Sequence, residues 1–203
     1  IFPLSGAVLL PGGRLPLNIF EPRYLSMVRD AIASPHRLIG MIQSYDDADE
    51  QGRAGALYDI GCAGRISSFS ESDDGRVMIT LSGTTRFRRL EDHEVEDGYR
   101  LAQVSWADFE ADLAPVADTI QRDHLVSVLH DYFKIKGFTA DWDQLDDCED
   151  ERLVTTLSMI CPFDVPEKQA LLEANSLPDR TQLLIAILEM ASHSDSDEAG
   201  ARH

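Results

Sequence analysis

Two charged side chains, Glu21 and Arg23, lie in the stretch LPLNIFEPRYLSMV (15–28), where a strand-like run passes into a helix-like run. A carboxylate beside a guanidinium could act as an acid and an anion anchor in a small hydrolase or transferase. The same residues also fit a joint in the fold, where Pro22 opens a helix and Glu21 lies near its positive end. Because the sequence assigns no nucleophile or second acid beside them, the joint is favoured. The enzyme alternative requires a pocket between the two halves of the chain.

Other catalytic and metal-binding patterns are missing from the sequence. It contains no GxxxxGK[ST], GxSxG or HExxH motif, and its three cysteines form no CxxC pair. The acidic stretch DWDQLDDCEDE (141–151) departs from a calcium-binding loop at Leu145, Asp146 and Arg152. We therefore expect no catalytic residues, no metal and no cofactor.

The charge balance constrains the partners. With 36 acidic and 18 basic residues, the net charge is −18, which favours basic partners and repels a phosphate backbone. The strongest basic cluster is TTRFRRL (84–90), with Arg86, Arg88 and Arg89. RNA binding is an alternative that requires these arginines to form a contiguous basic face. Pairing with nearby acids is favoured, and no nucleic-acid partner is expected.

The first part of the chain, residues 1–112, has the pattern of a β-rich subdomain. Short apolar runs alternate with glycine, proline and Asp-Gly turns, and they predict strands within 2–20, 38–43, 61–91 and 99–109. Asp74-Gly75 indicates a hairpin turn, and Gly83 indicates a bulge or bend. One amphipathic helix is inserted, and it begins at Pro22 and ends at Ser34-Pro35.

The second part, residues 113–193, changes to a helical period. Amphipathic helices are predicted at 116–133, near 150–160, from 164–167 onward, and after 176–179. Four helices with short connections predict a helical bundle. The segment 194–203 is too polar to pack and is predicted to be a mobile acidic tail.

These two periods give an α+β fold class. No apolar run reaches the roughly 18–20 residues that cross a bilayer, so we expect no membrane partner. The three widely spaced cysteines are typical of free thiols in a reducing cytoplasm, so we expect a cytoplasmic location. The chain begins at Ile1 without a methionine, which leaves open whether a leader precedes it.

Several stretches resemble the N-terminal domain of the ATP-dependent protease Lon. They are FPL (2–4), LLPGGRLPLNIFEPRYLSMV (9–28), IGMIQ (39–43), GCAGRI (61–66), LSGTTRFRRL (81–90) and PFDVPEKQALLEANSLPDRTQLLIAIL (162–188). The residues of this motif, which we interpret as structural, are Pro16, Phe20, Glu21, Pro22, Arg23, Tyr24, Gly83 and Arg86.

The resemblance implies a PUA-like β-barrel subdomain followed by an α-helical bundle. It also implies a noncatalytic module that binds unfolded or degron-bearing polypeptide, or a protease or chaperone component. The ATPase and Ser-Lys protease parts of Lon are not found in this sequence, so their activities are not expected. Whether the protein forms a homodimer is left open, and no binding residues are assigned.

Overall fold

The computed structural model describes residues 1–45, 55–73, 75–114 and 119–200, with the side chains of residue 146 and residues 194–200 left out. The chain divides into two compact units. We call Ile1–Pro115 with Pro162–Leu172 the strand unit, and Val116–Cys161 with Glu173–His203 the helix unit. The charge run predicted as a loop at 46–50, the residue Asp74, and the tail end 201–203 lie outside the described residues.

Six strands of the strand unit form one sheet. They are β1 (Phe2–Pro3), β2 (Arg14–Ile19), β3 (Leu38–Ile42), β4 (Ile60–Glu71), β5 (Val77–Glu94) and β6 (Arg100–Ser105). The strand order is β1-β3-β4-β5-β2, and β6 pairs with β5. β1 runs parallel to β3, and the other pairs are antiparallel. The predicted mixed α+β class is therefore confirmed.

The sheet is not closed into a barrel, so the predicted β-barrel is wrong. Its path ends at β1 on one side and at β2 on the other, and among the described residues no strand pairing joins these ends. β1 has only two residues, which is too short to carry a ladder onward to another strand. The PUA-like character of the fold stays a prediction.

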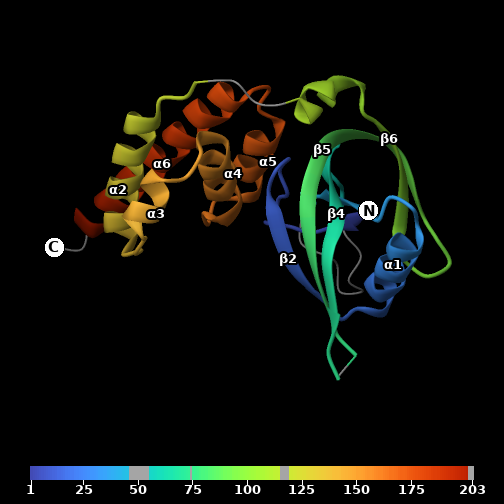
Figure 1. The fold of residues 1–203 in the computed structure, drawn as a ribbon. Helices are drawn as coiled ribbons and strands as arrows, with labels where there is room; N and C mark the ends of the chain where they lie inside the picture. The colour runs from blue at the N-terminus through green and yellow to red at the C-terminus, as the bar shows by residue number, and fades with distance from the viewer. Residues whose placement is uncertain (46–54, 74, 115–118, 201–203) are drawn as a thin grey trace. The chain divides into compact units, whose positions relative to one another are not determined.

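The β4–β5 hairpin dominates the sheet and is visible as a long curved pair of strands (Figure 1). Its register shifts between Ala63 and Gly64, where Thr84 is the extra residue on β5, so the irregularity expected at Gly83 is confirmed. A Cβ atom on Gly83 would lie 1.9 Å from the carbonyl oxygen of Leu10. Gly12 N also donates to Gly83 O at 3.1 Å, and Gly83 N donates to Gly13 O at 2.9 Å. The segments LLPGG and LSGTT, distant in sequence, therefore meet at Gly83.

Helix α1 (Pro22–Ala33) is the expected inserted helix. Pro22 opens it, and Ser34 ends it in an extended conformation. The buried side of this helix consists of Tyr24, Met27, Val28 and Ala31. The amphipathic spacing read from the sequence therefore fixes which side packs inward.

Helix α5 (Val165–Glu173) packs mainly against the strands. Its Lys168 Nζ donates to Gly6 O at 2.7 Å, and its Gln169 Nε2 donates to Ile60 O at 3.0 Å. Gln43 Nε2 donates to Gln169 Oε1 at 3.1 Å. The sequence grouped this helix with the bundle by its period, whereas buried side-chain donors attach residues 165–172 to the strand unit.

The helix unit contains α2 (Arg122–Lys136), α3 (Trp142–Asp146), α4 (Asp150–Ile160) and α6 (Leu177–Gly200). The helix predicted to start at 116 starts at Arg122; residues 115–118 lie outside the described part, and 119–121 are not helical. α3 was not predicted. Asp141 is its N-cap residue, and the Asp141 side chain accepts a hydrogen bond from Gln144 N at 3.2 Å. Trp142 stacks on His130 with ring centroids 3.5 Å apart. Side chains of α2, α4 and α6 form the core, including Leu125, Leu129, Leu153, Val154, Leu184 and Leu188.

Candidate functional site

The pair Glu21 and Arg23 forms a local ion pair at the start of α1. Arg23 Nε and Nη2 donate to Glu21 Oε2 at 3.0 and 2.7 Å, and the guanidinium lies 4.5 Å from the centre of the Tyr24 ring. Tyr24 is buried, and burial raises the pKa of its hydroxyl. Glu21 occupies the N-cap position without a side-chain capping bond. These two charges therefore bind each other, and the structural role of the pair stays a prediction.

Two other residues of this motif, Pro16 and Phe20, are exposed. Pro16 pairs with Thr80 of β5, within a strand at the end of the sheet path, where a residue without an N–H is tolerated. Phe20 follows β2 directly and is 64% exposed. The structural interpretation of the motif residues stays a prediction, and burial in the core does not explain Phe20.

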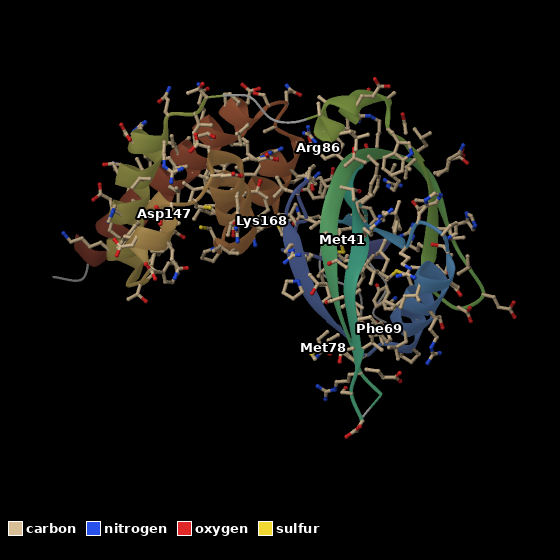
Figure 2. The ribbon with its side chains drawn as sticks, viewed as in Figure 1. Met41, Phe69, Met78, Arg86, Asp147 and Lys168 are labelled. Atoms are coloured by element: carbon tan, nitrogen blue, oxygen red, sulfur yellow. The ribbon has the colours of Figure 1, made fainter. Side chains whose placement is uncertain are left out.

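Arg86 is buried near the middle of β5, where it pairs with Cys62 close to the start of β4 (Figure 2). Its Nη2 donates to Asp112 Oδ1 at 2.7 Å and its Nε to Asp112 Oδ2 at 2.9 Å. Its Nη1 donates to Leu172 O at 3.1 Å, and the guanidinium lies 4.8 Å from the Phe109 ring centre. Arg86 thus joins β5, the 3₁₀ helix η1 (Ala107–Leu113) and α5 within the strand unit.

The neighbouring arginines of β5 are also paired with acids. Arg88 Nε donates to Asp108 Oδ2 at 2.8 Å. Arg89 bonds Asp59 Oδ1 at 2.9 Å and Asp92 Oδ1 at 2.8 Å. The contiguous basic face that RNA binding requires is therefore not formed by this cluster.

A groove between α1 and β4 was not assigned from the sequence. It has a volume of about 450 Å³ and is lined by Arg29, Ile32, Ala33, Arg37, Ile66, Ser67, Ser68 and Phe69. Phe69 lies near the turn end of the hairpin and is 50% exposed (Figure 2). The sequence does contain a signal that could have pointed to this groove. Phe69 is the single aromatic residue within the polar run SSFSES (67–72).

A second hollow of about 300 Å³ has a different character. Its lining includes Arg23, Asp92, His93, Glu94, Tyr99 and Arg100. Asp92 is held by Arg89 and Arg100, so its charge is already balanced. Tyr99 donates to Asp30 Oδ2 at 2.5 Å, and this hydrogen bond raises the pKa of Tyr99 to about 12. Two of the polar groups that line this hollow, the Asp92 carboxylate and the Tyr99 hydroxyl, are therefore already paired within the protein.

Two further features are absent from the residues that the structure describes. No group of three His, Cys, Asp or Glu side chains gathers there in a metal-binding arrangement. No described helix combines the length and the apolar character that crossing a membrane requires. The acidic stretch 141–151 forms α3 and the start of α4.

Comparison with known proteins identifies the family. Residues 1–190 match the family described as the ATP-dependent protease La (LON) substrate-binding domain. The chain belongs to this family. The resemblance recognised in the sequence is therefore confirmed.

The relatives and solved structures agree with this family. A Lon protease from Flavobacterium johnsoniae is 24% identical over 187 residues, which cover 89% of this chain and 22% of the relative. A crystal structure of a Lon N-terminal domain protein from Xanthomonas campestris superposes with a TM-score of 0.63 at 27% identity, covering 91% of this chain and 95% of the other. The N-terminal domain of a Mycobacterium avium complex Lon protease has a TM-score of 0.58 at 14% identity, covering 93% and 96%. The chain spans about a fifth of the length of the first of these relatives.

Proposed function

We propose that this domain binds unfolded or degron-bearing polypeptide segments without catalysis, and that the groove between α1 and β4 receives them. The observation that carries the proposal is the groove itself, an open channel whose apolar lining includes Ile32, Ile66 and Phe69. Phe69 is 50% exposed, Ile32 is partly exposed and Ile66 is buried. An exposed apolar groove of this kind is suited to side chains of an extended or unfolded segment. Membership of a substrate-binding domain family supports the same conclusion.

The groove is a better candidate than strand addition at the end of the sheet. β2 is the longer of the two strands at the ends of the path, and it contains Pro16. Proline has no N–H to donate to an added strand, and exposed edges are commonly protected in this way. Side-chain capture in the groove needs no such backbone ladder.

The enzyme alternative lacks a supporting arrangement in the described residues. Glu21 and Arg23 bond each other, and the acids that line the polar hollow include Asp92, which two arginines hold. A general acid or nucleophile works best with a free or base-activated group. A protease or chaperone component as partner stays a prediction that co-purification would test. Light scattering would show whether the protein forms a homodimer.

The test is fluorescence anisotropy of a labelled, permanently unfolded polypeptide titrated with wild-type protein and two variants. Phe69→Ser removes the aromatic wall of the groove. Met78→Ser is the matched control, because Met78 is 55% exposed on the same hairpin. Phe69 pairs with Ile79 and Met78 pairs with Ser70, so the two side chains point to opposite faces of the sheet.

We expect Phe69→Ser to weaken binding by about five- to twenty-fold, the range of a moderate hot spot. Met78→Ser should leave the affinity within about two-fold, and both variants should keep the wild-type melting temperature to within about 2 °C, because both side chains are half exposed. Equal affinities of the two variants, or saturable binding in wild type that neither variant changes, would contradict the assignment of the groove.

A further inference from the structure

The groove between α1 and β4 carries a charge opposite to that of the whole chain. Its two ionisable lining residues are Arg29 and Arg37, and the other lining side chains are neutral. The net charge of the chain is −18. An apolar channel with two guanidinium groups at its walls therefore lies within an acidic protein.

These two arginines are also available to a ligand. Among the residues that the structure describes, neither Arg29 nor Arg37 forms an ion pair, whereas Arg23, Arg86, Arg88, Arg89, Arg100 and Arg122 all do. The acid next to Arg29 in sequence, Asp30, accepts a hydrogen bond from the Tyr99 hydroxyl. Both arginines are exposed.

The backbone holds Arg37 in place beside the groove. Its φ angle is 53°, a left-handed conformation that is uncommon for arginine. Arg37 N donates to Ser34 Oγ at 3.1 Å, and Arg37 O accepts from Ile66 N at 3.0 Å. The hydrogen bond to Ile66 ties the segment that follows α1 to a lining residue of β4, so this wall of the groove is fixed before a ligand arrives.

We propose that the groove selects polypeptide segments in which a large apolar residue has acidic neighbours. The apolar side chain contacts Ile32, Ile66 and Phe69, and the neighbouring carboxylates bind Arg29 and Arg37. Guanidinium and carboxylate groups make charge-assisted hydrogen bonds. This inference rests on the proposed function, and it specifies the class of segment that the same groove takes.

The distance over which charges interact determines whether a bound peptide responds to the two groove arginines or to the net negative charge of the chain. At about 0.1 M salt the Debye length is about 10 Å, so acids farther away are largely screened from a bound ligand. Arginines that line the groove contact the ligand directly and are screened less. At this salt concentration the local charge therefore outweighs the net charge, which by itself favours basic partners.

The experiment uses three labelled peptides of equal length with one common tryptophan-leucine core. The core is flanked on both sides by glutamate, by glutamine or by lysine, and the affinities are measured by anisotropy at 0.1 M salt. We expect the glutamate peptide to bind about three- to ten-fold more tightly than the glutamine peptide, and the lysine peptide to bind most weakly.

Variants assign the preference to the two arginines. The double variant Arg29→Gln with Arg37→Asn should abolish the advantage of the glutamate peptide over the glutamine peptide. Asparagine is chosen at 37 because it tolerates the left-handed conformation. Arg14→Gln is the matched control, since Arg14 is exposed on β2 and does not line the groove. It should preserve the glutamate preference.

The outcomes separate this inference from the proposed function. If the lysine peptide binds best, or if the glutamate and glutamine peptides bind wild type equally, the charge selection is wrong. If Phe69→Ser still weakens all three peptides in that case, the groove remains the polypeptide site. If no peptide binds, or binding ignores Phe69→Ser, both the selection and the groove assignment are wrong.

Discussion

Arginine serves two opposite purposes in the strand unit. At the joint of β5, η1 and α5, Arg86 is only 4% exposed and bonds Asp112 and the carbonyl of Leu172. At the groove, Arg29 and Arg37 are exposed, and within the described residues they form no ion pair. A cation buried beside its acid holds three elements together, whereas a cation exposed beside apolar walls can bind a ligand.

The difference follows from the cost of removing charge from water. A buried guanidinium without a partner would lose several kcal/mol of hydration, so burial of Arg86 requires Asp112. An exposed guanidinium remains hydrated and needs no internal partner. Substitutions at the joint should therefore change stability, and substitutions at the groove should change binding.

The largest effect on stability is expected from Arg86→Ala. It leaves the buried Asp112 carboxylate without its cation and should lower the free energy of unfolding by about 3–5 kcal/mol, measured by urea denaturation. Arg88→Ala, two residues along the same strand, is the control. The Arg88–Asp108 pair is largely exposed, so its loss should cost less than about 1 kcal/mol. Equal losses at the two positions would contradict the distinction between buried and exposed arginines.

Gly83→Ala is expected to have the next largest effect. The added Cβ would meet the backbone oxygen of Leu10 at 1.9 Å, so the strand or the LLPGG segment must move. Such overpacking costs about 1–3 kcal/mol, measurable as a lower urea midpoint. Gly75→Asn is the control, because Gly75 has a φ of 79° with open space around it, and asparagine tolerates that conformation. A neutral Gly83→Ala would show that this contact can relax freely.

Tyr99→Phe tests how α1 is anchored, separately from the groove. Loss of the hydrogen bond to Asp30 should cost about 1 kcal/mol at pH 7, and polypeptide binding at the groove should be unchanged. The pKa of Tyr99 rises from 10.0 to about 12 in the folded protein, so the neutral hydroxyl is favoured by folding.

Because the pKa of Tyr99 is raised by folding, the loss of stability caused by Tyr99→Phe depends on pH. The contribution of the Tyr99 hydroxyl to the free energy of unfolding is fully present below pH 10 and is lost as pH rises through 12. Urea denaturation of wild type and Tyr99→Phe between pH 8 and pH 12 should therefore converge at the alkaline end. A difference that stays constant over that range would exclude the hydroxyl as its source.

Glu21→Ala should have the smallest effect, about 0.5 kcal/mol, because its ion pair with Arg23 is partly exposed. Thermal denaturation would detect it as a shift of about 1–2 °C, and the affinity for polypeptide should not change. Pro22→Ala is a useful companion, since it keeps the ion pair and alters only the first helical residue. A Glu21→Ala variant with an unchanged melting temperature and lost binding would overturn the structural role of this pair.

Local patterns predicted most of the individual elements. Pro22 and Ser34-Pro35 bound α1 as expected, and the expected bulge lies beside Gly83. Local signals sufficed because prolines and glycines restrict the backbone through their own covalent structure. α3 was missed because it is short, and an acidic stretch without an apolar period reads as a loop.

The candidate site was predicted only in outline. The sequence predicted a polypeptide-binding module, but it assigned no residue to the binding site. Arg29 and Ile32 come from α1 and Phe69 from β4, and no spacing rule connects segments almost 40 residues apart. The pairing of Arg88 with Asp108 was unassignable for the same reason, although nearby acids were expected.

The sequence by itself determined the α+β class, the family and the positions of most turns, because these depend on local backbone preferences and on motif residues. Only the tertiary structure decided that the sheet stays open, that residues 165–172 pack with the strands, and which arginines are paired. Those outcomes depend on which distant donors and acceptors meet. A free arginine and a buried, paired one look identical in sequence, and they differ only in what the folded chain places beside them.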